Sequence, residues 1–167
     1  MSKAKIKSFT LHNDRGQSVL STDLLRWKDE LNHPTGIFGP VIKYTWSVNG
    51  RPFESPKTGY WQELPDSSGF ICFESRWEPD NCVLLDACGK ERMRLTVPWQ
   101  MTGATDPQAG EAPTSFDNIS EPCLNPETGQ PGKFGVTAHV AGFFGCKFYF
   151  ELDYHSGQFL WCRRIRD

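Results

Sequence analysis

The stretch that decides the fold is FYFELDYHSGQFLWC, residues 148–162, because two aromatic runs flank a short turn. Residues 154–157 end in a glycine, which is typical of the connection between two antiparallel strands. The natural register places Asp153 opposite Gln158 at the base of this turn. In this register Phe150 faces Trp161 and Leu152 faces Phe159, with Phe148 on the same face. The pattern predicts a hairpin that buries one aromatic face in the core.

The other face of this hairpin is mixed in polarity, so it is either solvated or part of a binding surface. Its residues are Tyr149, Glu151, Leu160 and Cys162. Three earlier segments have the same strand, turn and strand pattern: residues 5–20, a segment that begins at residue 41, and residues 82–97. The second of them turns at Asn49-Gly50, the strongest two-residue hairpin signal, and Pro52 then indicates that the return strand is short or lies at an edge.

Alternation within the third hairpin predicts which of its side chains are buried. The inward set is Val83, Leu85, Met93 and Leu95, and the outward set is Leu84, Arg92, Arg94 and Thr96. A period of two residues of this kind describes an antiparallel sheet with one solvated side.

One short helix is predicted near residues 22–32. Ser21 or Thr22 can cap it, and its apolar positions are spaced by helical turns at Leu24, Trp27 and Leu31. Together with the hairpins, this predicts a mainly β protein with a minor α part. The expected architecture is an antiparallel curved sheet or a β-sandwich built from hairpins, with one short helix.

Length and composition are consistent with one domain spanning residues 1–167. The hydrophobic fraction of 38% and the charged fraction of 23% are ordinary for a globular protein, which argues against disorder, a collagen-like rod and a coiled coil. The net charge of −2 gives no global field to attract nucleic acid or a membrane surface. The chain shows neither a secretory signal nor an apolar run that could span a bilayer, so a cytoplasmic location is expected.

No motif in the chain indicates catalysis, a metal or a cofactor. The four histidines lie far apart, at positions 12, 33, 139 and 155, and the six cysteines form no Cys-x-x-Cys pair. Cys88 and Cys123 are the thiols most expected to be exposed. The acidic surroundings of Cys123 should raise its pKa and so disfavour a nucleophilic thiolate. We therefore expect a protein that is not an enzyme and that holds no metal or cofactor.

Residues 101–132 differ from the rest of the chain. They contain five prolines, four glycines and five acidic residues, with no lysine or arginine. This segment therefore carries a charge of −5, and because the whole chain carries −2, the remainder carries +3. We expect a long acidic loop rich in proline and glycine here, which is either a functional surface or a solvated connection.

The residues WEPDNCVLLDACGKERMRL, 77–95, followed by Pro98, resemble a hairpin of small bacterial proteins encoded beside polymorphic and contact-dependent growth-inhibition toxins. The stretch 148–162 is similar to a second element of the same group. The resemblance implies a cytoplasmic immunity protein, a non-catalytic protein that binds a cognate toxin domain and neutralises it by occluding its active site. Because both motifs are turn and core patterns, no functional residue is carried over from the group.

An acidic surface suits such a role, because many toxins of this kind bind anionic substrates through basic clefts. We therefore expect the partner-binding residues to be the acids of the segment: Asp106, Glu111, Asp117, Glu121 and Glu127. Two other functions remain open. A ligand-binding β-module of the carbohydrate type would need a pocket lined by two or more of Trp46, Trp61, Trp77 and Trp99. An enzyme with a dispersed carboxylate or histidine site would need a convergent polar pocket.

Overall fold

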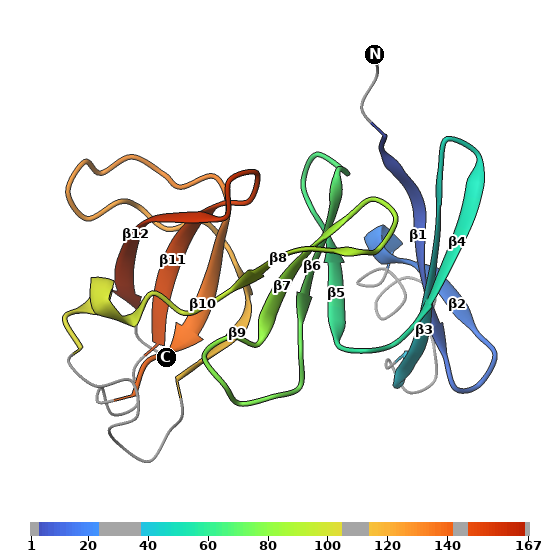
Figure 1. Ribbon diagram of the computed structural model, residues 1–167, viewed down its shortest axis with the longest axis horizontal. Helices are drawn as coiled ribbons and strands as arrows, with labels where there is room; N and C mark the ends of the chain where they lie inside the picture. The colour runs from blue at the N-terminus through green and yellow to red at the C-terminus, as the bar shows by residue number, and fades with distance from the viewer. Residues whose placement is uncertain (1–3, 24–37, 105–113, 142–146, 166–167) are drawn as a thin grey trace. The chain divides into compact units, whose positions relative to one another are not determined.

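The computed structural model describes residues 4–23, 38–104, 114–141 and 147–165, and strands dominate these ranges (Figure 1). The strands form three four-stranded antiparallel sheets with the orders β2-β1-β3-β4, β5-β6-β7-β8 and β12-β11-β10-β9. The predicted mainly β class, antiparallel and built from hairpins, is confirmed. The helix predicted near residues 22–32 lies outside the described residues except at Thr22 and Asp23, which belong to the 3-10 turn η1 (Ser21–Asp23).

Residue contacts divide the chain into two compact units. The first unit comprises Met1–Cys72 and Leu85–Glu91, and the second comprises Phe73–Leu84 and Arg92–Asp167. Each unit has its own buried apolar cluster. That residues 1–167 form one domain stays a prediction.

The first sheet belongs to the first unit and contains two of the predicted hairpins. Its strands are β1 (Ile6–Asn13), β2 (Ser18–Leu20), β3 (Val41–Val48) and β4 (Arg51–Pro56). The backbone φ angles are 51° at Asn49 and 77° at Gly50, the left-handed conformation that a tight two-residue hairpin turn requires. β4 lies at the edge of the sheet, as Pro52 indicates, because proline cannot donate to a neighbouring strand.

An aromatic cluster fills the core of the first unit. The rings of Phe9 and Tyr44 are 5.4 Å apart between centroids, and those of Tyr44 and Trp61 are 5.3 Å apart. The Tyr44 hydroxyl is fully buried, where it donates to the Gly59 carbonyl at 2.9 Å and accepts from the Trp61 amide at 3.2 Å. These two bonds satisfy a polar group that would otherwise destabilise the core.

The second sheet contains the third predicted hairpin. Its strands are β5 (Tyr60–Glu63), β6 (Gly69–Phe73), β7 (Cys82–Asp86) and β8 (Glu91–Leu95). The predicted outward orientation of Leu84 is wrong, because its side chain is fully buried together with Val83 and Leu85. β7 lies between β6 and β8 and is covered on both faces, so it reads as a continuous apolar run instead of an alternating one.

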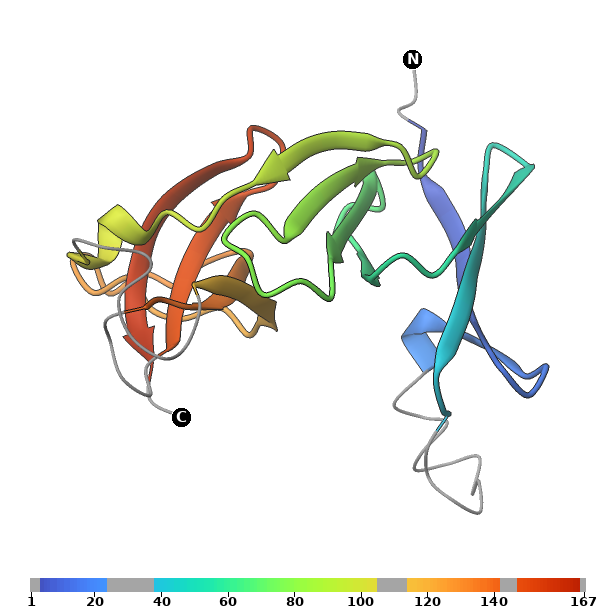
Figure 2. The same ribbon diagram turned by 60° about the horizontal axis from the view of Figure 1, so that its bottom comes forward.

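The third sheet lies in the second unit and contains the hairpin of residues 148–162. Its strands are β9 (Ser115–Ser120), β10 (Gly135–His139), β11 (Lys147–Asp153) and β12 (Gln158–Ile165). β10, β11 and β12, coloured orange to red, lie side by side in Figure 2. A second 3-10 turn, η2 (Trp99–Thr102), overlaps the start of the acidic segment.

The register of this hairpin differs from the prediction at one residue. Leu152 lies opposite Phe159 as expected, but a β-bulge then shifts the strands, and Phe150 lies opposite Cys162 instead of Trp161. The additional residue is Leu160, whose side chain is 56% exposed. A bulge inserts one unpaired residue, so each later side chain of β12 moves to the other face. The prediction that Trp161 joins Phe150 in the core is therefore wrong.

The mixed face of the hairpin is buried along β11. Tyr149 is fully buried, Glu151 is 5% exposed, and the ring of Trp161 packs on that of Tyr149 at 5.3 Å. Gly135 makes this possible, because a Cβ atom there would lie 2.1 Å from Cζ of Tyr149. The absence of a side chain on β10 lets the tyrosine ring lie directly over the strand.

Candidate functional site

The acidic segment 101–132 contains more regular structure than the sequence predicts. β9 occupies its middle, and an isolated bridge joins Leu124 to Pro131. β9 forms because Phe116, which is 4% exposed, is buried in the second unit. The high content of proline, glycine and acids conceals this short strand in the sequence.

The five predicted binding residues fall into two groups. Asp106 and Glu111 lie outside the described residues, whereas Asp117, Glu121 and Glu127 have exposed positions in the second unit. Asp117 is the extra residue of a bulge in β9, since Asn118 pairs with Thr137 and Phe116 pairs with Ala138. The bulge directs the carboxylate of Asp117 outward. There it forms an ion pair with Lys147, at 2.9 Å between Oδ2 and Nζ.

Glu121 and Glu127 follow in a connection whose backbone is fixed by hydrogen bonds. Glu121 directly follows β9, and Glu127 lies in a turn closed by the Asn125 amide, which donates to the Gln130 carbonyl at 2.8 Å. The Asn125 side chain also accepts from the Glu127 amide at 2.9 Å. Among the described residues, no ion pair engages Glu121 or Glu127.

A buried carboxyl group anchors the end of this connection to the sheet. Glu151 accepts a hydrogen bond from the Lys133 amide at 2.7 Å and another from the Tyr149 hydroxyl at 2.5 Å. Burial is the main cause that raises the pKa of Tyr149, and the neighbouring Glu151 carboxyl raises this pKa further. On β12, the Arg163 side chain donates to the Leu124 carbonyl at 3.0 Å, which ties a second point of the connection to the sheet.

The sequence did not indicate the roles of Glu151 and Tyr149. One signal was available in the sequence, an acidic residue within the aromatic run FYFEL, residues 148–152. Two glycines accompany it, Gly132 just before β10 and Gly135 at the first position of β10. A buried acid needs hydrogen-bond donors, and a nearby backbone can supply them where glycine allows a close approach.

Cys88 and Cys123, the two thiols that the sequence singles out, differ in exposure. Cys88 is exposed as predicted, and Cys123 is half-buried. The pKa of Cys123 is raised as predicted, but the main cause is burial of the thiol, and the Glu151 carboxyl is only a smaller cause. A raised pKa keeps this thiol protonated near neutral pH.

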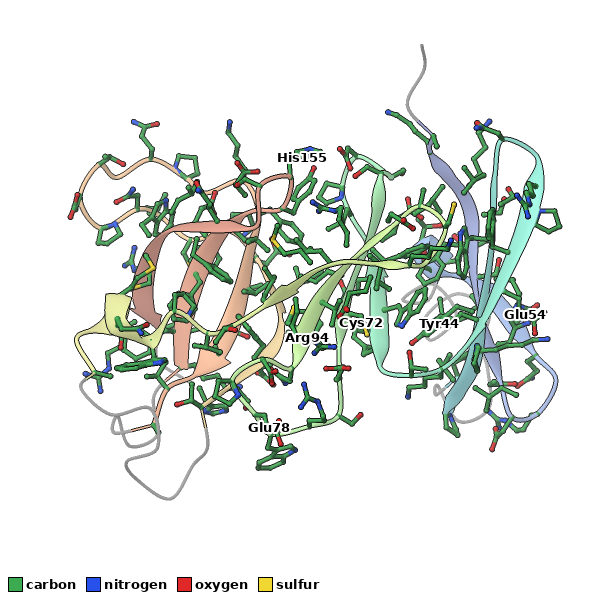
Figure 3. The ribbon with its side chains drawn as sticks, in the orientation of Figure 1. Tyr44, Glu54, Cys72, Glu78, Arg94 and His155 are labelled. Carbon is green, nitrogen blue, oxygen red and sulfur yellow. The ribbon has the colours of Figure 1, made fainter. Side chains whose placement is uncertain are left out.

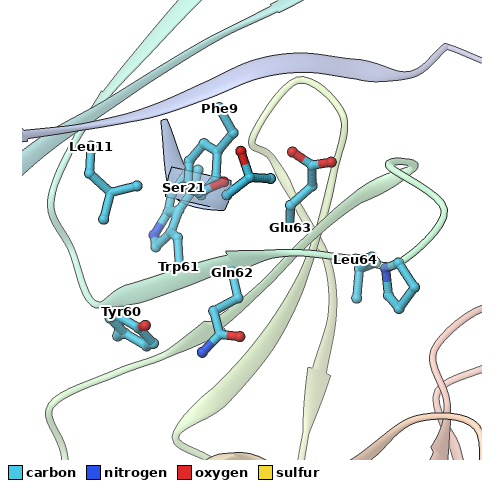
Figure 4. Close-up of a pocket in the computed structure, with 10 residues that line it drawn as sticks. Phe9, Leu11, Ser21, Tyr60, Trp61, Gln62, Glu63 and Leu64 are labelled. Atoms are coloured by element: carbon cyan, nitrogen blue, oxygen red, sulfur yellow. The ribbon is translucent and has the colours of Figure 1, made fainter. Parts of the chain in front are cut away.

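The first unit contains a pocket of about 340 Å³. Figure 4 shows the side chains around it, with Trp61 and Glu63 extending from β5 toward β1, which carries Phe9 and Leu11. Glu63 is the one carboxyl group among its described lining residues, and none of these is a histidine. The described lining of this pocket therefore gives no support to the enzyme alternative, which requires converging ionisable groups.

The tryptophans also give little support to a carbohydrate platform. Trp46 and Trp61 are 4% and 5% exposed, Trp99 is half-buried, and Trp77 alone of the four is highly exposed, at 77%. Of these four, Trp61 is the one that lines the pocket. In the ranges that the structure describes, no group of three or more His, Cys, Asp and Glu residues is placed to hold a metal ion.

Within the described parts of the chain, no helix has both the length and the apolar character needed to cross a membrane.

Comparisons with known proteins find a similar fold but no matching family. No protein-family model and no curated protein matches the sequence. The structure is similar to a chain of the solved structure described as "Structure of Tne2 in complex with Tni2", with a TM-score of 0.63 and 12% sequence identity. The alignment covers 96% of this chain and 99% of that chain. At this level of identity the similarity shows that the two chains share a fold over nearly their whole length.

Proposed function

We propose that this protein is an immunity protein, which binds a cognate toxin domain in the bacterial cytoplasm and neutralises it by occluding its active site. The observation that supports the proposal is that Asp117, Glu121 and Glu127 are all exposed, and that hydrogen bonds hold the backbone of the turn that carries Glu127. Two further observations support it. The hairpins 77–95 and 148–162 resemble those of immunity proteins, and the fold is shared with a chain that was solved in a complex of two proteins.

Electrostatic attraction explains how this surface would select its partner. The acidic segment carries −5 while the rest of the chain carries +3, so the negative charge is concentrated in one region of the sequence. A toxin that binds an anionic substrate presents a basic cleft, and fixed carboxylates compete for the same cations. Because the backbone is already ordered, little conformational entropy is lost when the surface binds.

Direct binding to the product of the adjacent upstream gene tests the proposal. The double charge reversal Glu121→Lys with Glu127→Lys should weaken this binding at least about tenfold at low salt, which corresponds to about 1.4 kcal/mol. Asp117→Lys should also weaken it, although the ion pair of Asp117 with Lys147 offsets part of its charge. High salt should reduce the wild-type affinity and narrow these differences.

A charge reversal in the first unit supplies the control. Glu54→Lys changes the net charge by the same amount as Asp117→Lys, at a side chain that is 63% exposed and also pairs with a lysine, and it should leave the affinity nearly unchanged. The reversals at residues 117, 121 and 127 should all change the free energy of unfolding by less than about 0.5 kcal/mol. If the wild-type protein neither binds nor protects against the toxin, the proposed function is wrong. If it binds and the reversals have no effect, the assigned surface is wrong.

A further inference from the structure

The connection between β6 and β7, residues 74–81, presents Trp77 to solvent. The side chain of Trp77 is 77% exposed, and among the described residues its ring contacts no other aromatic ring and its indole N–H has no acceptor. A single exposed apolar side chain is common on protein surfaces. The connection that carries Trp77 is, in addition, held at several points by ion pairs and hydrogen bonds.

Asn81 closes the base of this connection. It is 3% exposed, and its side chain accepts from the Phe116 amide at 2.8 Å and donates to the Phe116 carbonyl at 3.0 Å. The Asn81 carbonyl accepts from the Glu74 amide at 2.8 Å, which joins the two ends of the connection. Because Asp117 follows Phe116 directly, the base of the connection lies beside the strand residue that precedes Asp117.

Two arginines brace the connection on both sides of Trp77. Arg76 pairs with Glu74 at 3.0 Å, with Asp80 at 3.0 Å and with Glu78 at 2.5 Å. Arg94 on β8 pairs with Glu74 at 2.6 Å and donates to the Asp80 carbonyl at 2.8 Å. The hydrogen bond from Arg94 is the main cause that lowers the pKa of Glu74. Figure 3 shows Glu78 at the outer end of this connection and Arg94 toward its base.

We propose that Trp77 is the anchor residue of the interface with the toxin domain, and this inference rests on the proposed function. The partner it fits is a protein surface with an apolar pocket for the indole and basic residues at the edge of that pocket. Those basic residues would meet the carboxylates of Glu78 and Asp80, whose side chains are 60% and 43% exposed. With three carboxylates and two guanidinium groups, the braced connection has a net charge of −1, the sign that attracts such basic residues.

The physical basis is that the backbone around Trp77 is already ordered in the free protein, so binding loses little conformational entropy there. Tryptophan is enriched among the residues that dominate binding energy, since it buries a large area with two rotatable side-chain bonds. An anchor on a mobile loop loses part of that gain when the loop becomes ordered. Here the ion pairs and the Asn81 hydrogen bonds order the backbone while leaving the indole uncovered.

Affinity measurements with three variants test the proposal. Trp77→Ala should weaken binding to the toxin at least about 30-fold, which is about 2 kcal/mol, and Trp77→Phe should weaken it less. Leu160→Ala is the matched control, because Leu160 is an exposed apolar residue of the same unit, at 56%, and lies on β12. This control should retain the wild-type affinity. All three variants should retain the wild-type unfolding temperature, since neither side chain is in the core.

Tryptophan fluorescence provides a second readout. Toxin binding should shift the emission of the wild-type protein to shorter wavelength as the indole leaves water, and Trp77→Phe should abolish this shift. If the wild-type protein binds while Trp77→Ala binds equally well, the anchor assignment is wrong and the proposed function stands. If the wild-type protein binds no toxin, both are wrong. A shift on titration with oligosaccharides, but not with toxin, would instead assign Trp77 to sugar binding and overturn the proposal.

Discussion

Glu151→Ala tests whether one buried carboxyl group holds the acidic connection to the sheet. The substitution removes two hydrogen bonds, from the Tyr149 hydroxyl and from the Lys133 amide. Tyr149 is fully buried, so leaving its hydroxyl without an acceptor should cost about 1 to 3 kcal/mol. Lys133 is exposed, so water can replace the second bond, and its loss should cost about 0.5 to 1.5 kcal/mol. We expect a total destabilisation of roughly 1.5 to 4.5 kcal/mol.

Urea unfolding in a double-mutant cycle separates this interaction from the loss of packing. Tyr149→Phe removes the hydroxyl and keeps the ring over Gly135. If the two side chains are coupled, the double variant should be at least about 1 kcal/mol more stable than the sum of the single effects predicts. Glu121→Ala, at an exposed position on the same connection, is the control and should change stability by less than about 0.5 kcal/mol. Additive effects of the two substitutions would refute the reasoning.

Hydrogen exchange measures the local consequence. Glu151→Ala should accelerate exchange of the Lys133 amide, because its acceptor is lost. On the proposed function, the variant should also bind the toxin more weakly, since the connection that carries Glu121 and Glu127 is then less ordered. Unchanged exchange at Lys133 would show that the carboxyl group does not anchor this segment.

Three further predictions concern the cores of the two units. Phe150→Ala should lower the free energy of unfolding by about 3 to 5 kcal/mol, because the ring is fully buried. Trp161→Ala should lower it by no more than about 2 kcal/mol, because its side chain is half-buried. Urea unfolding of the two variants compares these effects. Gly135→Ala should cost about 3 kcal/mol or more, measured in the same way, because the new Cβ would clash with a buried ring. Burial raises the pKa of Tyr44 from about 10 to about 12. The unfolded chain therefore loses this proton first, so the stability supplied by the neutral hydroxyl is complete below pH 10 and is lost as the pH rises through 12. Unfolding measured against pH should show this loss in the wild-type protein and not in Tyr44→Phe.

Turn chemistry made most of the fold predictable. Asn49-Gly50 and the glycine at the end of each four-residue turn determine where the chain reverses, since few residues accept the left-handed backbone conformation. The apolar alternation of Phe148, Phe150 and Leu152 identified a core face that the structure confirms. The bulge at Leu160 was not predictable, because it depends on how β12 pairs with β11. The pattern of apolar and polar residues along β12 does not indicate it.

The candidate site was predictable in its charge and not in its geometry. The absence of lysine and arginine from residues 101–132 is visible in the sequence, and it singles out the acids of that segment. The sequence does not indicate the role of Trp77, because the charged residues around it are typical of a solvent-exposed connection between strands. Its exposure follows from contacts that Arg94 and Asn81 make with residues 14 to 35 positions away.

By itself, the sequence determined the secondary structure class, the positions of the hairpins and the uneven distribution of charge. These properties depend on residues that are close along the chain: turn residues, alternation with a period of two, and local composition. The tertiary structure decided that β7 and β11 are buried on both faces, that Asp117 is directed outward by a bulge, and that ion pairs and hydrogen bonds hold the connection that carries Trp77. Each of these depends on pairing between distant segments, and local patterns do not encode which partner a strand or a side chain meets in the folded protein.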